Sequence, residues 1–264
     1  MVETLLKRER AGVFVYRRSA AVRVKTFTAS YLAVDSPFRP RQIWGLVDPE
    51  KTSPRRLLSD QIYRLDFDGF LVGGTYRVYS DVLAGDVSAL KELGHTVGVF
   101  AIHDSQVVGD ADFILATLFA NSRVFGLRPF VDILDAAEER GVPVVPLVYI
   151  VRPGETSISS LADPFPLPPL PPVLSRYVRL ARRLGGVVYV EGGSGARRPP
   201  SLDVLRSVAA VSAEVPVLSG GGIASVEDAR AVFAAGADVI VIGTLLEKGA
   251  VSVVEEILSL RGKL

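Results

Sequence analysis

Two short apolar segments near the C-terminus each end in glycine, and one helical segment lies between them. The residues that follow these segments include Gly220, Gly221, Gly222, Gly243 and Thr244. Glycine lets a ligand approach the backbone closely, and the N–H groups of such a loop can point at an anion. In a (β/α)₈ barrel, the loops after strands 7 and 8 bind phosphate in this way. The pattern therefore predicts a phosphate site and six preceding strands, whereas glycines that only make tight turns are the alternative.

Apolar segments of strand length do precede this pair, with helical segments between most of them. The expected strands are 43–47, 67–72, 97–102, 113–117, 142–151, 187–190, 215–218 and 238–242. Four expected helices have bounds, 54–65, 129–140, 173–184 and 246–260. Three more are expected: one after Thr75 that is interrupted near Gly85, one opened by Pro200, and one capped by Ser225 and Asp228. The gap before 113–117 is too short for a helix with two loops, which needs about 10–12 residues. We therefore expect an α/β fold, a modified (β/α)₈ TIM barrel whose helix 3 is missing or replaced, so that one flank is open.

Two further segments lie outside this alternation. Residues 1–42 are expected to form an N-terminal extension packed on the barrel domain of residues 43–264. Alternation over residues 13–28 predicts a hairpin across the bottom of the barrel. The Pro-rich segment 152–172 leaves the C-terminal end of a strand, so we expect it to be an active-site lid, with an ordinary surface loop as the alternative.

Composition excludes several classes of function. The 30 Lys and Arg residues nearly balance the 29 Asp and Glu residues, which argues against a nucleic-acid-binding protein. The chain has no cysteine and two histidines, so a bound metal should be a hard cation with oxygen ligands. No apolar run approaches the ~20 residues of a membrane-spanning helix, and the charged N-terminus does not resemble a signal peptide. These features predict a cytoplasmic protein.

Polar residues gather at the expected C-terminal ends of the strands, where barrel enzymes place their chemistry. They are Asp48, Thr75, Tyr189, Glu191, Ser194 and Thr244. Asp48 and Thr75 end neighbouring strands and can hold Mg²⁺ while phosphate and water complete its shell, although Asp48 could instead cap the next helix. Glu191 faces the phosphate loops and can remove a proton from a substrate hydroxyl. Its alternative role is a salt bridge to Arg197 or Arg198.

The motifs from residue 43 onwards resemble one family of barrel enzymes. They are VDPEK at 47–51, VGGT at 72–75, ANSR at 120–123, YVEGGSG at 189–195, SGGGI at 219–223 and IGT at 242–244. Together they look like the geranylgeranylglyceryl phosphate synthases of archaea, whose bacterial relatives are heptaprenylglyceryl phosphate synthases. YVEGGSG is the most specific motif, since SGGGI and IGT would fit many phosphate-binding barrels.

The resemblance implies a Mg²⁺-dependent prenyltransferase that joins sn-glycerol 1-phosphate to a prenyl diphosphate, geranylgeranyl diphosphate, and forms the first ether bond of archaeal lipids. It implies that Asp48 and Thr75 bind Mg²⁺, and our candidate catalytic residues are Glu191 and Asp48. The glycerol phosphate would be bound by Tyr189, Val190, Glu191, Gly192, Gly193, Ser194, Gly195, Gly220, Gly221, Gly222, Gly243 and Thr244. The prenyl chain would lie along the opened flank, lined by Val99, Phe100, Ala101, Ile102, Phe113, Leu115, Leu118 and Phe119.

The chain also departs from the pattern of this family. The departures are at 43–45, where a basic or polar residue is usual, at 103–106, at 124–126, where an aromatic run is reduced, and at Gly192, where an alanine is usual. Two alternatives therefore stay open, a phosphosugar isomerase or lyase barrel and a barrel that binds phosphate without turnover. We also expect a homo-oligomer, most simply a dimer, because a mean hydropathy of +0.32 leaves apolar surface to cover. Peripheral membrane contact through the lipid product is a further expectation.

Overall fold

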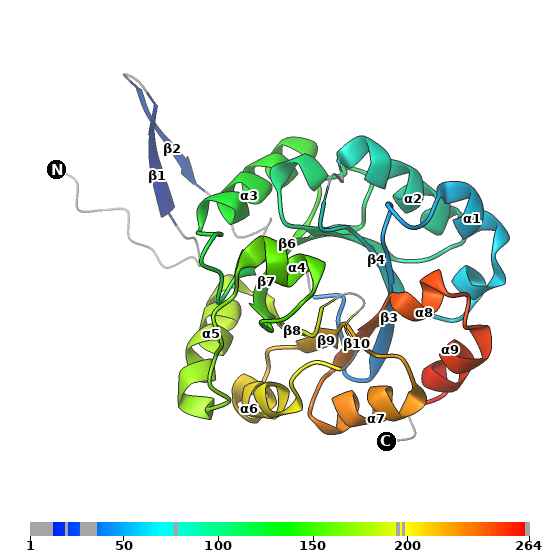
Figure 1. The fold of residues 1–264 in the computed structure, drawn as a ribbon. Helices are drawn as coiled ribbons and strands as arrows, with labels where there is room; N and C mark the ends of the chain where they lie inside the picture. The colour runs from blue at the N-terminus through cyan, green and yellow to red at the C-terminus, as the bar shows by residue number, and fades with distance from the viewer. Residues whose placement is uncertain are drawn as a thin grey trace.

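The computed structural model describes residues 36–76, 79–193, 196 and 199–261, and the backbone of 13–18 and 21–26. Within this part of the chain, parallel strands close into a barrel in the order β10-β3-β4-β5-β6-β7-β8-β9 (Figure 1). They are β3 (Gln42–Val47), β4 (Gly69–Val72), β5 (Val97–Ala101), β6 (Phe113–Phe119), β7 (Val144–Val151), β8 (Val187–Glu191), β9 (Val217–Gly220) and β10 (Val239–Ile242). The predicted (β/α)₈ TIM barrel is confirmed.

The barrel strands are rich in apolar and β-branched residues because parallel strands are covered on both faces. Every residue of β7 is buried. An aspartate that precedes a strand repeatedly accepts a hydrogen bond from an N–H group at the start of the neighbouring strand. Asp68 accepts from Ile43 at 2.7 Å, and Asp238 accepts from Val217 at 2.8 Å. These carboxylates satisfy strand ends at the bottom of the barrel, far from the glycine-rich ends.

Helices surround the barrel on the outside (Figure 1). They are α1 (Pro54–Ser59), α2 (Ser80–Glu92), α3 (Arg128–Arg140), α5 (Pro171–Leu184), α6 (Leu202–Ser212), α7 (Val226–Ala234), α8 (Thr244–Glu247) and α9 (Val251–Leu258). Between β5 and β6 the described chain forms only the 3₁₀ turn η2 (Asp104–Gln106), so helix 3 is replaced, as predicted. No helix in the described residues combines the length and apolar character that crossing a membrane requires.

Three helix predictions were wrong. α2 is not interrupted at Gly85, which instead lets α2 pack closely on Pro54 at the start of α1. The first expected helix stops before Asp60, whose side chain caps the 3₁₀ turn η1 (Gln61–Arg64). The last expected helix is divided into α8 and α9 by Gly249, which has a φ of 65°. Each difference arises from a local contact or backbone angle that hydrophobic periodicity does not report.

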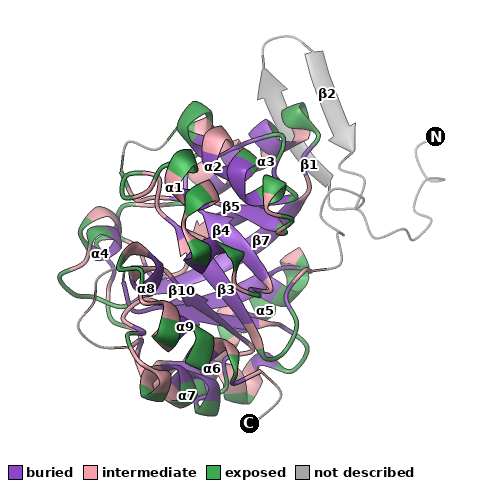
Figure 2. Ribbon diagram, turned by 90° about the vertical axis from the view of Figure 1, so that its right-hand side faces the viewer, coloured by how far each residue is buried: buried purple, intermediate pink, exposed green. Residues whose placement is uncertain are grey.

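The barrel strands are mostly buried, whereas the outer helices carry exposed residues (Figure 2). Two apolar clusters fill the molecule, one inside the barrel and one between the barrel and its helices. In the inner cluster, the rings of Phe38, Trp44 and Phe113 lie 4.9–5.9 Å apart and close the N-terminal end of the barrel. The open end is therefore the C-terminal one.

The flank that lacks helix 3 is packed at the positions where we expected a prenyl groove. Ala101 and Ala116 are 0% exposed and belong to the outer cluster, together with Val107 and Phe130. Strand alternation places these alanines on the outer face of the sheet, under η2 and α3. The expectation of an open flank there was wrong.

The N-terminal extension contains an antiparallel hairpin. Strands β1 (Val13–Arg18) and β2 (Ala21–Thr26) pair with Val15 opposite Val24, which confirms the predicted hairpin in its backbone. At the end of the expected extension, Phe38 packs on Trp44 and Phe113 of the barrel. The expected packing of residues 1–35 on the barrel, and of the hairpin across its bottom, lies outside what the structure describes.

The carboxylate of Asp86, on α2, is buried without a hydrogen bond or an ion pair in the described residues. It is 1% exposed, and neither of its oxygens has a hydrogen-bond partner among the described residues. Burial, followed by the charge of Asp48, raises the pKa of Asp86 from 3.8 to about 6. Because this pKa is higher in the folded than in the unfolded chain, ionisation of Asp86 lowers stability as pH rises from about 4 through about 6.

Asp86→Asn is therefore expected to raise the free energy of unfolding at neutral pH by about 1–3 kcal/mol, since an uncharged amide is less costly to bury. Near pH 4 both side chains are neutral in the folded state, so the difference should largely disappear. Urea denaturation at both pH values measures it. A difference of equal size at both pH values would show that the carboxylate charge is not the cause.

Candidate active site at the mouth of the barrel

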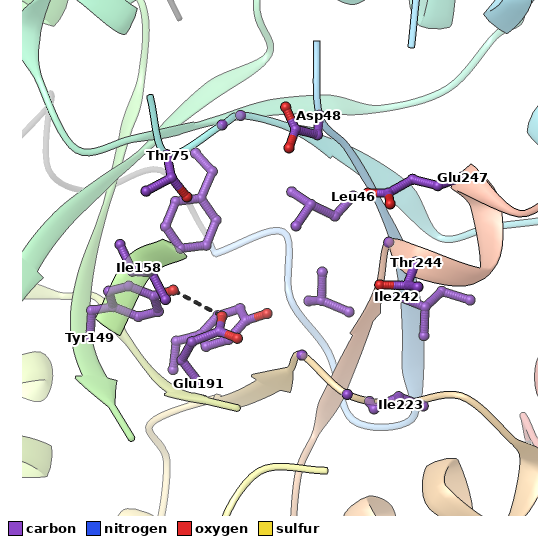
Figure 3. A pocket seen from close by; sticks show the side chains of 18 of the residues that line it. Leu46, Asp48, Thr75, Tyr149, Ile158, Glu191, Ile223, Ile242, Thr244 and Glu247 are labelled. Atoms are coloured by element: carbon purple, nitrogen blue, oxygen red, sulfur yellow. Dashed lines mark hydrogen bonds between the residues drawn. The ribbon is translucent and has the colours of Figure 1, made fainter. Parts of the chain in front are cut away.

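The C-terminal ends of the strands surround one pocket, in which the predicted polar residues come together (Figure 3). Its polar side chains belong to Asp48, Thr75, Tyr149, Tyr189, Glu191, Thr244 and Glu247. Its glycines are Gly73, Gly74, Gly221, Gly222 and Gly243, and its apolar side chains are Leu46, Phe100, Ile102, Ile158, Ile223, Val241 and Ile242. Among the described residues, no lysine or arginine lines this pocket.

Glu191 ends β8 and is 6% exposed. The hydroxyl of Tyr149 on β7 donates to Glu191 Oε2 at 2.9 Å (Figure 3). The N–H of Gly193 donates to Glu191 Oε1. Burial raises the pKa of Glu191 to about 7, although hydrogen bonds from Gly193, Tyr149, Gly192 and Tyr189 lower it. A carboxylate with this pKa can take up a proton near neutral pH, as a general base must.

Two buried tyrosines surround this carboxylate. Burial, together with the charge of Glu191, raises the pKa of Tyr149 and of Tyr189 well above the ordinary value. Both hydroxyls therefore stay protonated and act as donors. They orient the Glu191 carboxylate without neutralising its charge.

The loop after β9 passes so close to Glu191 that only glycine fits. Gly221 has a φ of 81°, and a Cβ there would clash with the Glu191 carboxylate and the Gly193 backbone. The N–H of Gly192 donates to the carbonyl of Gly220 at 2.8 Å, which joins the loops after β8 and β9. After this loop, Ser225 accepts from the N–H of Asp228 at 3.1 Å and caps α7, as predicted. Close backbone approach, and not only a tight turn, thus explains these glycines.

Gly221→Ala is expected to weaken glycerol phosphate binding by more than about tenfold, because the added Cβ displaces the loop from Glu191. Gly94→Ala is the matched control, since Gly94 has a similar φ of 88° but nothing within 4 Å of its added Cβ. Calorimetric titration with glycerol phosphate compares the two. Equal affinity in both variants would contradict a role of the Gly221 loop in binding.

Asp48 and Thr75 line the same side of the pocket, after β3 and β4 (Figure 3). One carboxylate and one hydroxyl suit Mg²⁺, which keeps several waters and often binds substrate phosphates. The described residues contain no group of three His, Cys, Asp or Glu side chains that would form a metal cage. The alternative role of Asp48 as a cap of the next helix was wrong, because Ser53 caps α1. Asp48 Oδ1 instead accepts from the N–H of Glu50 at 3.0 Å, within the turn after β3.

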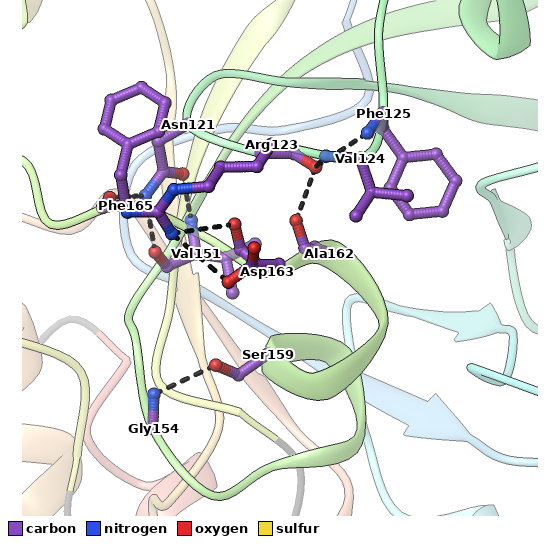
Figure 4. A network of polar contacts seen from close by, with 11 residues as sticks. Asn121, Arg123, Val124, Phe125, Val151, Gly154, Ser159, Ala162, Asp163 and Phe165 are labelled. Carbon is purple, nitrogen blue, oxygen red and sulfur yellow. Dashed lines mark hydrogen bonds and ion pairs between the residues drawn. The ribbon is translucent and has the colours of Figure 1, made fainter.

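The ANSR motif fastens the Pro-rich segment over the barrel (Figure 4). Asn121 donates to the carbonyls of Val151 and Phe165 at 2.8 and 2.7 Å, and Arg123 lies 3.2 Å from the Asp163 carboxylate. Instead of a loop alone, the segment contains the short helix α4 (Ser157–Ala162).

α4 also reaches the pocket, as a lid would. The side chain of Ile158 lines the pocket, and the Tyr76 hydroxyl, from the loop after β4, donates to the carbonyl of Ser157 at 3.1 Å. The segment after β7 thus contacts the pocket through Ile158 and is joined by Tyr76 to the loop after β4, on another side of the pocket.

Not every predicted site residue lies in the pocket. Val190 belongs to the outer cluster, so its side chain faces the helices and not a ligand. Gly192, Gly193 and Gly220 support the neighbouring loops without lining the pocket. The remaining predicted binding residues, Ser194 and Gly195, and the possible partners of Glu191, Arg197 and Arg198, lie outside the described residues.

Sequence reasoning missed Tyr149 and Glu247. Tyr149 is the one residue with a polar side-chain group in the otherwise apolar strand β7, which is a signal that it has a partner. Glu247 follows Thr244 by one helical turn on α8, so the same periodicity that places Thr244 at the pocket also places Glu247 there.

Aromatic side chains form the wall of the pocket towards β6. The rings of Phe100 and Tyr149 lie 5.3 Å apart, those of Phe119 and Tyr149 lie 5.4 Å apart, and Phe125 stacks on Phe119 at 4.5 Å. Beyond Phe125, Val124 is exposed. Of the predicted groove residues, only Phe100 and Ile102 line the pocket, whereas Phe119 and Phe125 pack behind Tyr149 without lining it.

Comparisons with known proteins agree with this geometry. The PcrB family model matches residues 39–260. The geranylgeranylglyceryl phosphate synthases of Thermococcus kodakarensis and Pyrococcus horikoshii are each 34% identical over 77% of this chain, which covers 83% and 82% of their lengths. The crystal structure of (S)-3-O-geranylgeranylglyceryl phosphate synthase from Thermoplasma acidophilum, in complex with its substrate sn-glycerol-1-phosphate, matches with a TM-score of 0.74. That match has 25% identity and covers 85% of this chain and 94% of the other.

Proposed function

We propose that this chain, which belongs to the PcrB family, is a prenyltransferase that joins sn-glycerol 1-phosphate to geranylgeranyl diphosphate. The products are geranylgeranylglyceryl phosphate and diphosphate, in the biosynthesis of ether lipids. The observation that carries this proposal is the position of Glu191, a buried carboxylate with a pKa of about 7, directly beside the Gly221 loop. A small acceptor whose phosphate and hydroxyl are a few bonds apart could place its phosphate on the Gly221 loop and its hydroxyl on Glu191.

In this reaction the acceptor phosphate binds the glycine-rich loops after β9 and β10. Its hydroxyl then lies against Glu191, which the Tyr149 hydroxyl holds in place at 2.9 Å. The hydroxyl oxygen attacks C1 of the prenyl chain, and its proton passes to Glu191. The bond between C1 and the diphosphate oxygen breaks, and its electron pair leaves with the diphosphate.

Asp48 and Thr75 are the residues that would hold Mg²⁺, and their hard oxygen donors fit this ion. When bound, Mg²⁺ neutralises charge on a diphosphate leaving group. Asp48 and Thr75 lie across the pocket from Glu191 (Figure 3). We call the side with Asp48 and Thr75 the donor side, where the diphosphate would bind, and the side with Glu191 the acceptor side.

The aromatic wall is suited to the prenyl chain. Phe100 and Tyr149 line the pocket, and Phe119 and Phe125 pack in turn behind Tyr149, so this wall is apolar and aromatic in depth. Each CH₂ removed from water contributes about 0.8 kcal/mol, so a wall of this kind favours a long apolar donor.

The test is incubation of the protein with labelled sn-glycerol 1-phosphate, Mg²⁺ and prenyl diphosphates of increasing length. We expect labelled lipid, with most product from geranylgeranyl diphosphate. Binding of both substrates without product would support the inactive barrel. Absence of labelled lipid, together with turnover of a phosphosugar in a parallel incubation, would support the isomerase or lyase.

We also propose that the protein is a symmetric dimer that works in the cytoplasm and touches the membrane peripherally through its product. The exposed apolar side chains of Val124, Leu127 and Val131, at and before the start of α3, support an association surface. Small-angle scattering at micromolar concentration should give the mass of a dimer, and a monomer mass would reject this part of the proposal.

A further inference from the structure

The pocket lacks the positive charge that its proposed ligands need. Asp48, Glu191 and Glu247 give it three carboxylates, and no lysine or arginine lines it in the described part of the chain. Both proposed substrates are anions, and the diphosphate that leaves carries more charge than one divalent metal neutralises. A further cation on the side of the pocket that carries Asp48 would offset this imbalance.

Lys51 lies at the edge of the donor side. Its Nζ is 3.3 Å from Asp48 Oδ2 and 3.0 Å from Glu247 Oε1, so the ammonium bridges two carboxylates that line the pocket. The Lys51 side chain is 42% exposed, whereas Asp48 and Glu247 are 17% and 23% exposed. The Lys51 side chain is thus the most exposed of the three, at the edge of a pocket that it does not itself line.

Hydrogen bonds to backbone carbonyls fix the two segments that carry this bridge. The carbonyl of Asp48 accepts from the N–H groups of Lys51 and Thr52 at 2.9 and 3.1 Å, which fixes the turn that carries Lys51. On the other side, Arg56 of α1 donates to the carbonyls of Leu246 and Glu247 at 3.3 and 2.9 Å and so fixes the end of α8. The distance between the two carboxylates is thus set by the fold and not by Lys51 alone.

We propose that Lys51 contacts the diphosphate of the prenyl donor and that Glu247 positions the Lys51 ammonium for this contact. The inference rests on the proposed function, which supplies the diphosphate. Lys51 keeps its ion pair with Glu247 when the diphosphate is bound. Lys51 stabilises the negative charge that grows on the leaving oxygen as the bond to C1 breaks. Glu247 touches no reacting atom and acts only through Lys51.

The test measures binding of inorganic diphosphate by calorimetry, in the presence of Mg²⁺, to the full chain. Lys51→Met keeps the side-chain stem and removes the charge, and it is expected to weaken diphosphate binding by about tenfold. Glu247→Ala should weaken binding by a smaller factor, because Lys51 is present but less well oriented. Both variants should bind glycerol phosphate with unchanged affinity.

Lys91→Met is the matched control. Lys91 makes a similar exposed ion pair with Asp112 at 2.9 Å, with 40% of its side chain exposed, but neither residue lines the pocket. This variant should bind diphosphate as the wild type does. Lys51→Arg should retain most of the affinity, because the charge is kept.

The double variant Lys51→Met/Glu247→Ala distinguishes positioning from a separate role. If Glu247 acts through Lys51, the second substitution adds no further loss. A wild type that binds no diphosphate would overturn the proposed function, and this inference with it. A wild type that binds diphosphate with the same affinity as Lys51→Met would overturn the inference alone, and additive losses in the double variant would overturn the role of Glu247.

Discussion

Asp48→Asn is expected to lower prenyl transfer by about 10²–10³-fold, since it removes the charge of a proposed metal ligand, and such an ion is worth several kcal/mol at a leaving group. Glycerol phosphate affinity should change little, because the acceptor loops after β9 and β10 do not include Asp48. Initial rates across a Mg²⁺ titration, with calorimetry for glycerol phosphate, measure the two effects separately. Part of the loss should be recovered at high Mg²⁺, because the asparagine oxygen is still an oxygen ligand.

Asp48 also accepts from the N–H of Glu50, so a loss of folding must be distinguished from a loss of metal binding. An asparagine side chain can keep that hydrogen bond, and the variant should therefore unfold at a midpoint close to that of the wild type. If glycerol phosphate affinity and turnover fall by the same factor, Asp48 is mainly a structural residue of this turn and the metal role is wrong.

Glu191→Gln should reduce the rate of transfer by about 10²–10⁴-fold, the usual contribution of a positioned general base. Glutamine can still contact Tyr149 and Gly193, so the architecture of the mouth is retained while the proton acceptor is lost. Single-turnover rates with saturating substrates measure this effect. A Glu191→Gln variant that transfers at the wild-type rate would show that another group, or water, takes the proton.

The pH dependence gives a second, independent test of Glu191. Burial raises its pKa to about 7, and only the ionised form can accept the proton. The value of kcat/KM should therefore rise with pH up to about 7 and then level off, and this inflection should be absent from Glu191→Gln. Stability changes in the opposite direction. Because the folded-state pKa lies above the ordinary 4.5, ionisation of Glu191 destabilises the fold as pH rises from about 4.5 through about 7.

The barrel and the general position of its site could be predicted from local patterns. Apolar segments that end in glycine identify strands β9 and β10, and the position of Asp48 and Thr75 after expected strands places them at the same end. These inferences succeed because, in a barrel of parallel strands, all C-terminal ends lie on one side. The short gap between β5 and β6 likewise reveals the absence of a helix by its length alone.

Contacts between distant segments could not be predicted in this way. The hydrogen bond between Tyr149 and Glu191 depends on the pairing of β7 with β8, and the bridge from Lys51 to Glu247 depends on closure of the barrel between β10 and β3. The expected groove failed for a related reason. Alternation shows that half of the residues on β5 and β6 face outwards, but only the packed structure shows that Ala101 is one of them and that the outer face is covered.

The central claim is that one pocket holds the acceptor with its phosphate on the glycine-rich loops and its hydroxyl on Glu191. A crystal structure of the protein with sn-glycerol 1-phosphate tests this most directly. We predict the phosphate within hydrogen-bond distance of the backbone N–H groups of Gly221, Gly222, Gly243 and Thr244, and the terminal hydroxyl within about 3 Å of Glu191. A complex in which the ligand occupies another place while these loops stay empty would contradict the account.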